Sequence, residues 1–504
     1  MWLLLSLVAA GGALGGPRLE SGPVPEHQLS DPYYEAARAA LAADLERPLQ
    51  QGAAKNVILF VGDGMSLATI TAARILDGQL AGGPGEENVL SFESFPFSGL
   101  VKTYNTDRQS PDSAGTMTAI MTGVKTRAGI VGLSEAARRG RCAELEAHWL
   151  VTALELAERA GMSTGVVTTA RITHATPAAA YAHSPDRGWE GDADLGEKAR
   201  SAGCTDIASQ LVHFPFGDGL EVALGGGRIN FLPRQTRNAG SPAHRGRRKD
   251  GRDLTREWLN RSPAARYVTR RSELMEVDAA ETRHLLGLFS SSHMAYELDR
   301  RRADSEEPSL VEMVQRALDL VSRNPKGFLL VVESGRIDHA HHAGNAQRAL
   351  VEAIELSRAV QLAMDRTREH DTLIVVTADH GHGISIGGRN VPRGNPVLGL
   401  VKDDVDLSGL PYTVLSYATG PGLGKLHATP RVGQNRVDLR ELDLDDPDFR
   451  QEATFPLRAT AHSAEDVPVY ARGPWAHLLS GTIEQNVIFH VIEHAAQLST
   501  GGSR

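Results

Sequence analysis

The chain has 504 residues, 41% of them hydrophobic, so it is long enough to bury a large core. Its 62 acidic residues outnumber its 53 basic ones, and the formal net charge is -9. This balance argues against a general nucleic-acid-binding protein, because such proteins present a basic surface. One basic run, at 245–249, departs from the average, and we interpret it as a solvated loop.

The N-terminal stretch, residues 1–16, is short and apolar and ends in small residues. It is too short to span a bilayer comfortably and is typical of a signal peptide, so we expect an exported protein, secreted or periplasmic. No later segment of the sequence predicts a transmembrane helix. Residues 32–45 predict an amphipathic helix, an arm suited to packing on a second subunit.

The sequence contains two cysteines, Cys142 and Cys204. An exported protein meets an oxidising environment, which favours a single disulfide between them. The alternative is two buried free thiols.

Apolar, β-branched runs predict buried parallel strands, and helical patterns lie between them. The predicted strands cover 56–61, 164–169, 328–332 and 372–377, and the predicted helices cover 66–76, 112–122, 145–160, 308–322 and 346–367. This alternation predicts a doubly wound α/β fold, with a mostly parallel sheet and helices on both faces. In such sheets, ligands bind beyond the carboxyl ends of the strands.

Two stretches interrupt the alternation. Residues 228–284 are basic and punctuated by Pro and Gly, and residues 385–460 are rich in Gly, Pro and Asp, with one strand predicted at 412–418. We therefore expect an α/β core over 30–384 and 461–498, with 228–284 as an inserted region. Residues 385–460 are expected to form a smaller, crown-like insertion that includes one core strand.

An acidic residue, Asp63, directly follows the first predicted strand between two glycines that let backbone approach a ligand. On its own, such an Asp is equally typical of a turn that caps the next helix. Further along, Asp112-Ser113-Ala114-Gly115-Thr116 opens a predicted helix, whose N-terminus favours an anionic phosphate. The alternative role for Ser113 is an ordinary N-cap.

Two more clusters follow predicted strands. Asp338 and His342 are four residues apart, so one helical turn puts both on the same side, and together they offer the oxygen and nitrogen that suit zinc. Asp379 and His380 offer the same pair of ligand types side by side. Three strand-end clusters of Asp, Glu and His in one chain predict a metal centre.

These parts suit phosphoryl transfer. Two neighbouring divalent ions hold both oxygens of an in-line displacement, and metal coordination activates a serine hydroxyl. An arginine can clamp two phosphoryl oxygens with its rigid fork.

The motifs together resemble the alkaline phosphatases, and the animal type more than the shorter bacterial type, over about residues 30–495. The runs that carry the resemblance are Asp63-Gly64-Met65, Asp112-Ser113-Ala114-Gly115-Thr116, His174-Ala175-Thr176-Pro177, Gly335-Arg336-Ile337-Asp338-His339 with His342, Thr377-Ala378-Asp379-His380, and His462-Ser463-Ala464-Glu465-Asp466.

The resemblance implies a role for each residue of the site. Ser113 would form a phosphoserine intermediate, and Arg187, oriented by Asp112, would clamp the phosphate. One zinc ion would bind Asp338, His342 and His462, and a second would bind Asp63, Asp379, His380 and the Ser113 oxygen. One magnesium ion per subunit would bind Asp63, Thr176 and Glu333. His174 and His339 would lie near the phosphate, His382 beside the first zinc, and Cys142 and Cys204 would pair.

The resemblance also implies small phosphate monoesters as substrates, two zinc ions per subunit and a homodimer, with no nucleic-acid partner. The sequence stops at 501–504 without the apolar tail that many animal relatives exchange for a lipid anchor, so no such anchor is expected. Ser290 stands where those relatives offer a Glu to calcium, so we expect no calcium site. The alternative is that Asp299 or Asp304 rebuilds the site from a shifted loop.

Two alternatives remain open at this point. One is a phosphodiesterase or sulfatase of the same superfamily, although the run Asp112-Ser113-Ala114-Gly115 lacks the Cys/Ser-x-Pro-x-Arg motif expected of a sulfatase. A catalytically inactive binding protein is the other, although every expected ligand is present.

Overall fold

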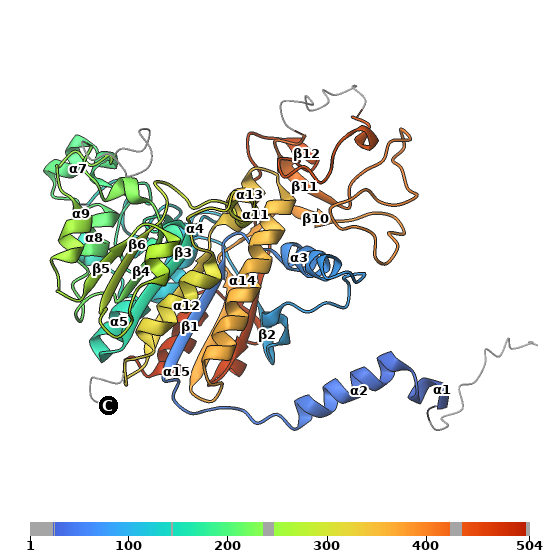
Figure 1. Ribbon diagram of the computed structural model, residues 1–504, viewed down its shortest axis with the longest axis horizontal. Coiled ribbons are helices and arrows are strands. Elements are labelled where there is room, and N and C mark those ends of the chain that lie inside the picture. The colour runs from blue at the N-terminus through green and yellow to red at the C-terminus, as the bar shows by residue number, and fades with distance from the viewer. Residues whose placement is uncertain (1–23, 25, 143–144, 235–245, 424–435, 500–504) are drawn as a thin grey trace, which may run out of the picture. The chain divides into compact units, whose positions relative to one another are not determined.

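The structure is a computed structural model that describes residues 24, 26–142, 145–234, 246–423 and 436–499 (Figure 1). The expected signal peptide, residues 1–16, lies outside the described residues. Within the described ranges, no helix combines the length and the apolar character that crossing a bilayer requires. The chain divides into two compact units, residues 1–48 and 49–504.

The first unit contains α1 (Glu26–Leu29) and α2 (Pro32–Leu45). The α2 helix coincides with the predicted arm. Asp31 caps it by accepting hydrogen bonds from the backbone N–H groups of Tyr33 and Tyr34, at 2.9 and 3.2 Å. None of its residues is buried.

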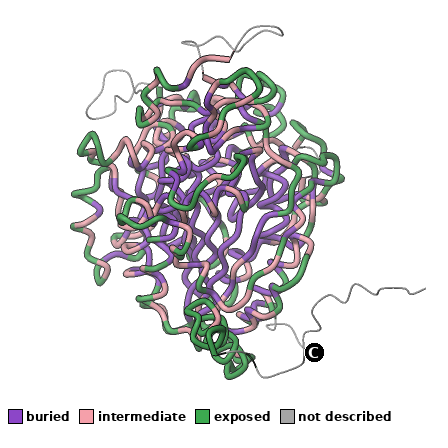
Figure 2. Tube along the Cα trace, turned by 90° about the vertical axis from the view of Figure 1, so that its right-hand side faces the viewer, coloured by how far each residue is buried: buried purple, intermediate pink, exposed green. Residues whose placement is uncertain are grey.

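A ten-stranded sheet forms the centre of the second unit. Its strands, in spatial order, are β15 (Gly481–Glu484), β2 (Phe97–Lys102), β14 (Val467–Arg472), β8 (Thr372–Ala378), β1 (Asn56–Gly62), β7 (Phe328–Ser334), β3 (Ser163–Arg171), β4 (Val222–Gly226), β6 (His284–Leu288) and β5 (Ala265–Val268). Only β14 runs antiparallel to its neighbours among these described strands. The four predicted strands are β1, β3, β7 and β8, and they are buried along almost their whole length. Figure 2 shows in purple the buried part of the trace.

Helices pack on both faces of this sheet, which confirms the doubly wound α/β class. The helices are α3 (Leu67–Leu80), α4 (Ser113–Thr122), α5 (Ala153–Ala160), α6 (Ala175–Ala178), α7 (Glu197–Ser201), α8 (Ile207–Val212), α9 (Leu254–Leu259), α10 (Arg271–Met275), α11 (Glu297–Arg302), α12 (Leu310–Val321), α13 (Arg336–His342), α14 (Ala346–Arg366) and α15 (Val487–Ala496). One group contains α3, α12 and α14, with α14 touching both of the others, and a second contains α4, α5 and α15. Figure 1 shows α12 and α14 side by side along the sheet.

Three expectations need correction. The helix expected over 145–160 is broken, because Thr152 starts α5 afresh: its hydroxyl accepts from Glu155 N–H, and the Glu155 carboxylate accepts from Thr152 N–H. The strand expected at 412–418 lies at β11 (Leu415–Gly420). It pairs with β10 (Ile384–Ile386) and β12 (Ala453–Pro456) in a separate three-stranded sheet, so it is not a core strand. Part of 228–284 is not inserted, because β5 is the edge strand of the main sheet.

The basic run at 245–249 is also more than a solvated loop. Arg245 lies outside the described residues, but the Arg248 side chain is fully buried. Its guanidinium donates to the two carboxylate oxygens of Asp206 at 2.9 and 3.1 Å and also binds Asp250. Because two carboxylates compensate the buried charge, Arg248 anchors this loop to the start of α8, where Asp206 is the N-cap.

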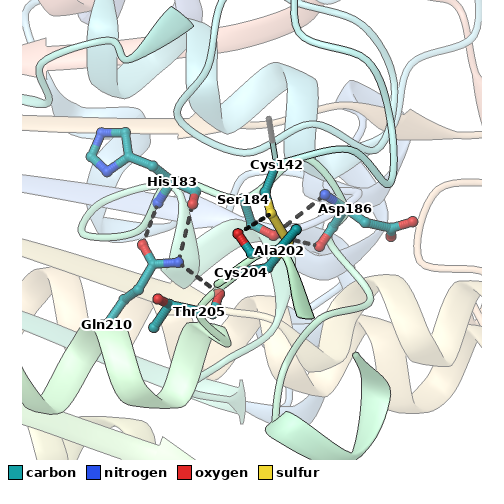
Figure 3. The surroundings of a disulfide bond; sticks show 8 residues. All are labelled: Cys142, His183, Ser184, Asp186, Ala202, Cys204, Thr205 and Gln210. Atoms are coloured by element: carbon teal, nitrogen blue, oxygen red, sulfur yellow. Dashed lines mark hydrogen bonds between the residues drawn. A yellow bond between two sulfur atoms is a disulfide. The ribbon is translucent and has the colours of Figure 1, made fainter. Parts of the chain in front are cut away.

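Cys142 and Cys204 form the expected disulfide, with their Cα atoms 5.8 Å apart. Figure 3 shows it beside Gln210, whose side chain accepts from His183 N–H and donates to the carbonyl oxygens of His183 and Thr205. The bridge therefore ties Cys204 to Cys142, and Gln210 ties α8 to His183.

Replacing both cysteines by serine should lower the free energy of unfolding by about 2–5 kcal/mol, because the bridge closes a loop of 62 residues in the unfolded chain. Thermal unfolding of the double variant, compared with the oxidised unmodified protein, measures the effect. Reductant should lower the melting temperature of the unmodified protein and leave the variant unchanged. Equal melting temperatures in all samples would contradict a stabilising bridge.

Candidate metal centre and active site

Three carboxylates meet at one edge of the main sheet, as the sequence predicts. Strand β1 lies between β7 and β8, with Val61 paired to Glu333 and Gly62 paired to Ala378. Asp63 and Asp379 therefore follow neighbouring strand ends, and the Glu333 side chain lies beside them. All three residues have no exposed surface.

A first group of candidate metal ligands contains Asp338, His342 and His462. Helix α13 places Asp338 and His342 one turn apart, with Oδ1 and Nε2 separated by 3.4 Å. His462 comes from β13 (His462–Ser463), which pairs with β9 (Gly381–His382), and its Nε2 also lies 3.4 Å from Asp338 Oδ1.

The protons on these two histidines point away from the group. Nδ1 of His342 donates to the carbonyl oxygen of Thr460 at 2.6 Å, and Nδ1 of His462 donates to that of Pro111 at 2.8 Å. In the neutral rings, both Nε2 atoms therefore carry lone pairs, and they face each other at 3.1 Å. Ligand atoms bound at about 2.0–2.1 Å around a tetrahedral zinc ion lie about 3.3 Å apart. The spacing and the donor set fit zinc.

A second group surrounds His380. Its Nε2 lies 3.5 Å from Asp63 Oδ1 and 3.4 Å from Asp379 Oδ2. The Ser113 hydroxyl oxygen is 3.2 Å from the same nitrogen. Three oxygens, including that of the predicted nucleophile, therefore lie within 3.5 Å of one imidazole nitrogen.

The carboxylates of the site need a cation. Asp63 Oδ1, Asp379 Oδ2 and Glu333 Oε1 are buried and make no hydrogen bond. Burial raises the pKa of Asp63 well above its usual value and raises the pKa of Asp379 to about 6 and of Glu333 to about 8. Divalent ions would compensate this buried charge and satisfy the unpaired oxygens, so the residues present fit bound metal.

The third group, expected to hold magnesium, contains a nitrogen as well. The Thr176 hydroxyl lies 3.5 Å from Asp63 Oδ2, as the resemblance implies. His174 is also close enough to share an ion with Asp63 and Glu333. Thr168, which sequence reasoning missed, donates its hydroxyl proton to Glu333 Oε2.

Ser113 is the first residue of α4, and it is not the N-cap. Asp112 is the cap, and its Oδ1 accepts from Gly115 N–H at 3.1 Å. The Ser113 hydroxyl is therefore not used for capping and is free to face the metal ligands. The positive end of the helix dipole lies at the same place, where it favours an anionic substrate.

Arg187 lies next to this helix start. Its Nη1 donates to Asp112 Oδ2 at 3.0 Å, and its Nη2 donates to His174 Nε2 at 3.1 Å. These contacts support the orienting role expected of Asp112. They also place His174 beside the predicted phosphate clamp.

His339 lies in a group of three imidazoles. Its ring centroid is 5.5 Å from that of His174 and 4.0 Å from that of His293. Burial lowers the pKa of His339 to about 3, so the ring is neutral at pH 7. Sequence reasoning missed His293, because it lies in a loop after β6 with no neighbouring signal.

The predicted ligands, the nucleophile and the clamp thus lie in one cluster, although they come from segments spread along most of the chain. The carboxylates of Asp63, Glu333 and Asp379 are buried there, whereas the side chains of His342 and Arg187 keep 34% and 24% of their surface exposed. The family profile described as alkaline phosphatase matches residues 54–498.

Two relatives are the tissue-nonspecific alkaline phosphatases of Gallus gallus and Homo sapiens. The first is 46% identical over 482 residues, covering 94% of this chain and 91% of that protein. The second is 44% identical over 489 residues, covering 95% of this chain and 91% of that protein.

Solved structures share the fold. The alkaline phosphatase of Thermus thermophilus has a TM-score of 0.64 at 24% identity and covers 95% of this chain and 96% of that one. The alkaline phosphatase of the Antarctic bacterium TAB5 has a TM-score of 0.61 at 22% identity and covers 89% of this chain and 100% of that one. On the profile match and the relatives' identity over nearly the whole length, the chain belongs to the alkaline phosphatase family.

Proposed function

We propose that this chain hydrolyses phosphate monoesters by transferring the phosphoryl group first to Ser113 and then to water. Membership of the alkaline phosphatase family implies metal-dependent hydrolysis of phosphate monoesters. The observation that supports Ser113 as the nucleophile is its hydroxyl, 3.2 Å from His380 Nε2 and beside buried carboxylate oxygens that lack partners.

We further propose two zinc ions and one magnesium ion per subunit. Asp338, His342 and His462 would hold the first zinc ion, and Asp63, Asp379 and His380 the second, with the Ser113 oxygen. Asp63, Thr176 and Glu333 would hold magnesium. When bound, these ions lower the pKa of the serine hydroxyl and neutralise charge on the phosphoryl oxygens.

The side chains of the site have separate tasks in this mechanism. Ser113 Oγ attacks phosphorus as the bond to the leaving alcohol breaks, and water then cleaves the phosphoserine. Arg187 binds two phosphoryl oxygens, and Asp112 keeps its guanidinium aimed at them. His174 and His339 lie near the bound phosphate.

Replacing Arg187 by alanine should weaken inhibition by inorganic phosphate by roughly 10- to 150-fold, because a charge-assisted contact worth about 1.5–3 kcal/mol is lost. The inhibition constant should change more than kcat does. Arg139→Ala is a matched control, because Arg139 binds Asp186 on the same turn. Phosphate inhibition that is the same in both variants would contradict the clamp.

Two assays test the proposed function as a whole. Purified protein should hydrolyse an aryl phosphate monoester much faster than the matching diester, and metal analysis should give two zinc ions and one magnesium ion per subunit. Faster diester turnover would favour the related phosphodiesterase. Zinc in place of magnesium at the third group would correct that assignment.

The proposal extends to assembly and location. A homodimer is supported by α2, a capped helix with apolar side chains and no buried residue. Export is supported by the apolar stretch at 1–16. As domains, we propose a core over 30–384 and 461–498, and a crown-like insertion over 385–460 built around the three-stranded sheet.

A further inference from the structure

Two buried polar side chains of the 385–460 segment reach the metal centre. Thr460 has 2% of its surface exposed and Tyr417 has 1%. Neither belongs to the ligand sets proposed above, yet both contact helix α13, which carries Asp338 and His342. Buried polar groups that are hydrogen-bonded on all sides fix the position of their partners.

Thr460 contacts both histidines at the end of α13 and also His382. Its backbone N–H donates to the His342 carbonyl oxygen at 3.0 Å, and its own carbonyl oxygen accepts from His342 Nδ1 at 2.6 Å. Its hydroxyl oxygen lies 2.7 Å from the His341 carbonyl oxygen and 3.0 Å from His382 Nδ1, and it can donate its one proton to either of them.

His382 links Thr460 to the first group of metal ligands. Its Nε2 lies 2.6 Å from Asp338 Oδ1, the oxygen that also faces His342 and His462. The ring approaches closely because Gly64 has no side chain: a Cβ atom at Gly64 would lie 2.7 Å from the His382 ring. His382 is thus confined between Gly64, Asp338 and Thr460.

Tyr417 contacts the same helix, α13, through His341. Its hydroxyl lies 2.8 Å from His341 Nδ1, and the second nitrogen of that ring lies 2.9 Å from the Thr69 hydroxyl. Both nitrogens of His341 therefore have partners. The ring ties α13 to β11 on one side and to α3 on the other.

We propose that Thr460 is a positioning residue of the metal centre, whose hydroxyl holds His382 against Asp338 and so fixes the carboxylate that binds the first zinc ion. Tyr417 assists by anchoring α13 through His341. The inference rests on the proposed zinc position. Partners that orient metal ligands in this way typically contribute about 10- to 100-fold to metal affinity.

The test compares zinc affinity in Thr460→Val, which keeps the shape and removes the hydroxyl, with Thr460→Ser, which keeps the hydroxyl. Chelator competition on the holoenzyme should show zinc bound about 10- to 100-fold more weakly in Thr460→Val and near-normal binding in Thr460→Ser. The visible spectrum of the cobalt-substituted protein should change only in Thr460→Val. Thr413→Val is the matched control, because Thr413 is a buried threonine of the same segment whose hydroxyl donates to the Leu415 carbonyl oxygen.

The control should lose some stability and keep its zinc affinity and cobalt spectrum. Equal affinities in Thr460→Val and the unmodified protein would overturn the inference while leaving the proposed function intact. Unmodified protein without zinc at this position would overturn both. Should Thr460→Val fail to fold, Thr460→Ala removes the same hydroxyl, and unchanged zinc affinity and cobalt spectrum there would equally contradict the inference.

Discussion

Ser113→Ala should lower kcat/KM for an aryl phosphate by roughly 10³-fold or more, because the hydroxyl that accepts the phosphoryl group is gone. The remaining activity would come from water that attacks the bound ester directly. Phosphate should still bind, since Arg187 and the metal ligands are unchanged. Steady-state hydrolysis, with metal content measured on the same sample, gives the result.

A matched control lies at the other end of the same helix. Thr122 is the last residue of α4, and its hydroxyl donates to the Thr118 carbonyl oxygen at 2.7 Å, away from the metal ligands. Thr122→Val should keep nearly full activity. If Ser113→Ala retained the activity of this control, Ser113 would not be the nucleophile.

Asp338→Ala and His462→Ala should each lose one zinc ion per subunit. In the first variant, the two lone-pair-bearing nitrogens of His342 and His462 remain without the carboxylate that balances the ion's charge. In the second, two ligands remain, and a structural zinc site normally needs four ligands and a catalytic site three. Elemental analysis after dialysis counts the ions, and activity should fall with the zinc.

His370→Ala serves as the control for these variants, because His370 is largely exposed and its nearest charged group is Asp371, at 3.9 Å. It should keep full zinc and full activity. Full zinc occupancy in Asp338→Ala and His462→Ala would show that the proposed ligand set is wrong.

The sequence predicted the centre of the fold well because the buried strands are short, apolar and β-branched. Asp63, Asp379 and His380 could be predicted as a group, since residues that follow parallel strands lie at one edge of a sheet. Asp338 and His342 could be predicted as a pair from helical spacing alone.

Other parts depend on contacts between distant segments. No local pattern connects His462 with Asp338, and only the family resemblance suggested the pair before β13 and β9 were seen to bring them together. Thr460 and His293 gave no signal, because a lone polar residue in a loop has no periodicity. The break before α5 arises from the capping contacts of Thr152, which are favourable enough to override the helical pattern.

The central claim is that Ser113 carries the phosphoryl group during turnover. The most direct test is to mix the metal-loaded enzyme with an aryl phosphate, quench in acid, and locate phosphate by mass spectrometry of the digested protein. We predict phosphate on the peptide that contains Ser113, and on that residue within it. Phosphate on another residue, or turnover with no phosphorylated protein at any quench time or pH, would contradict the account.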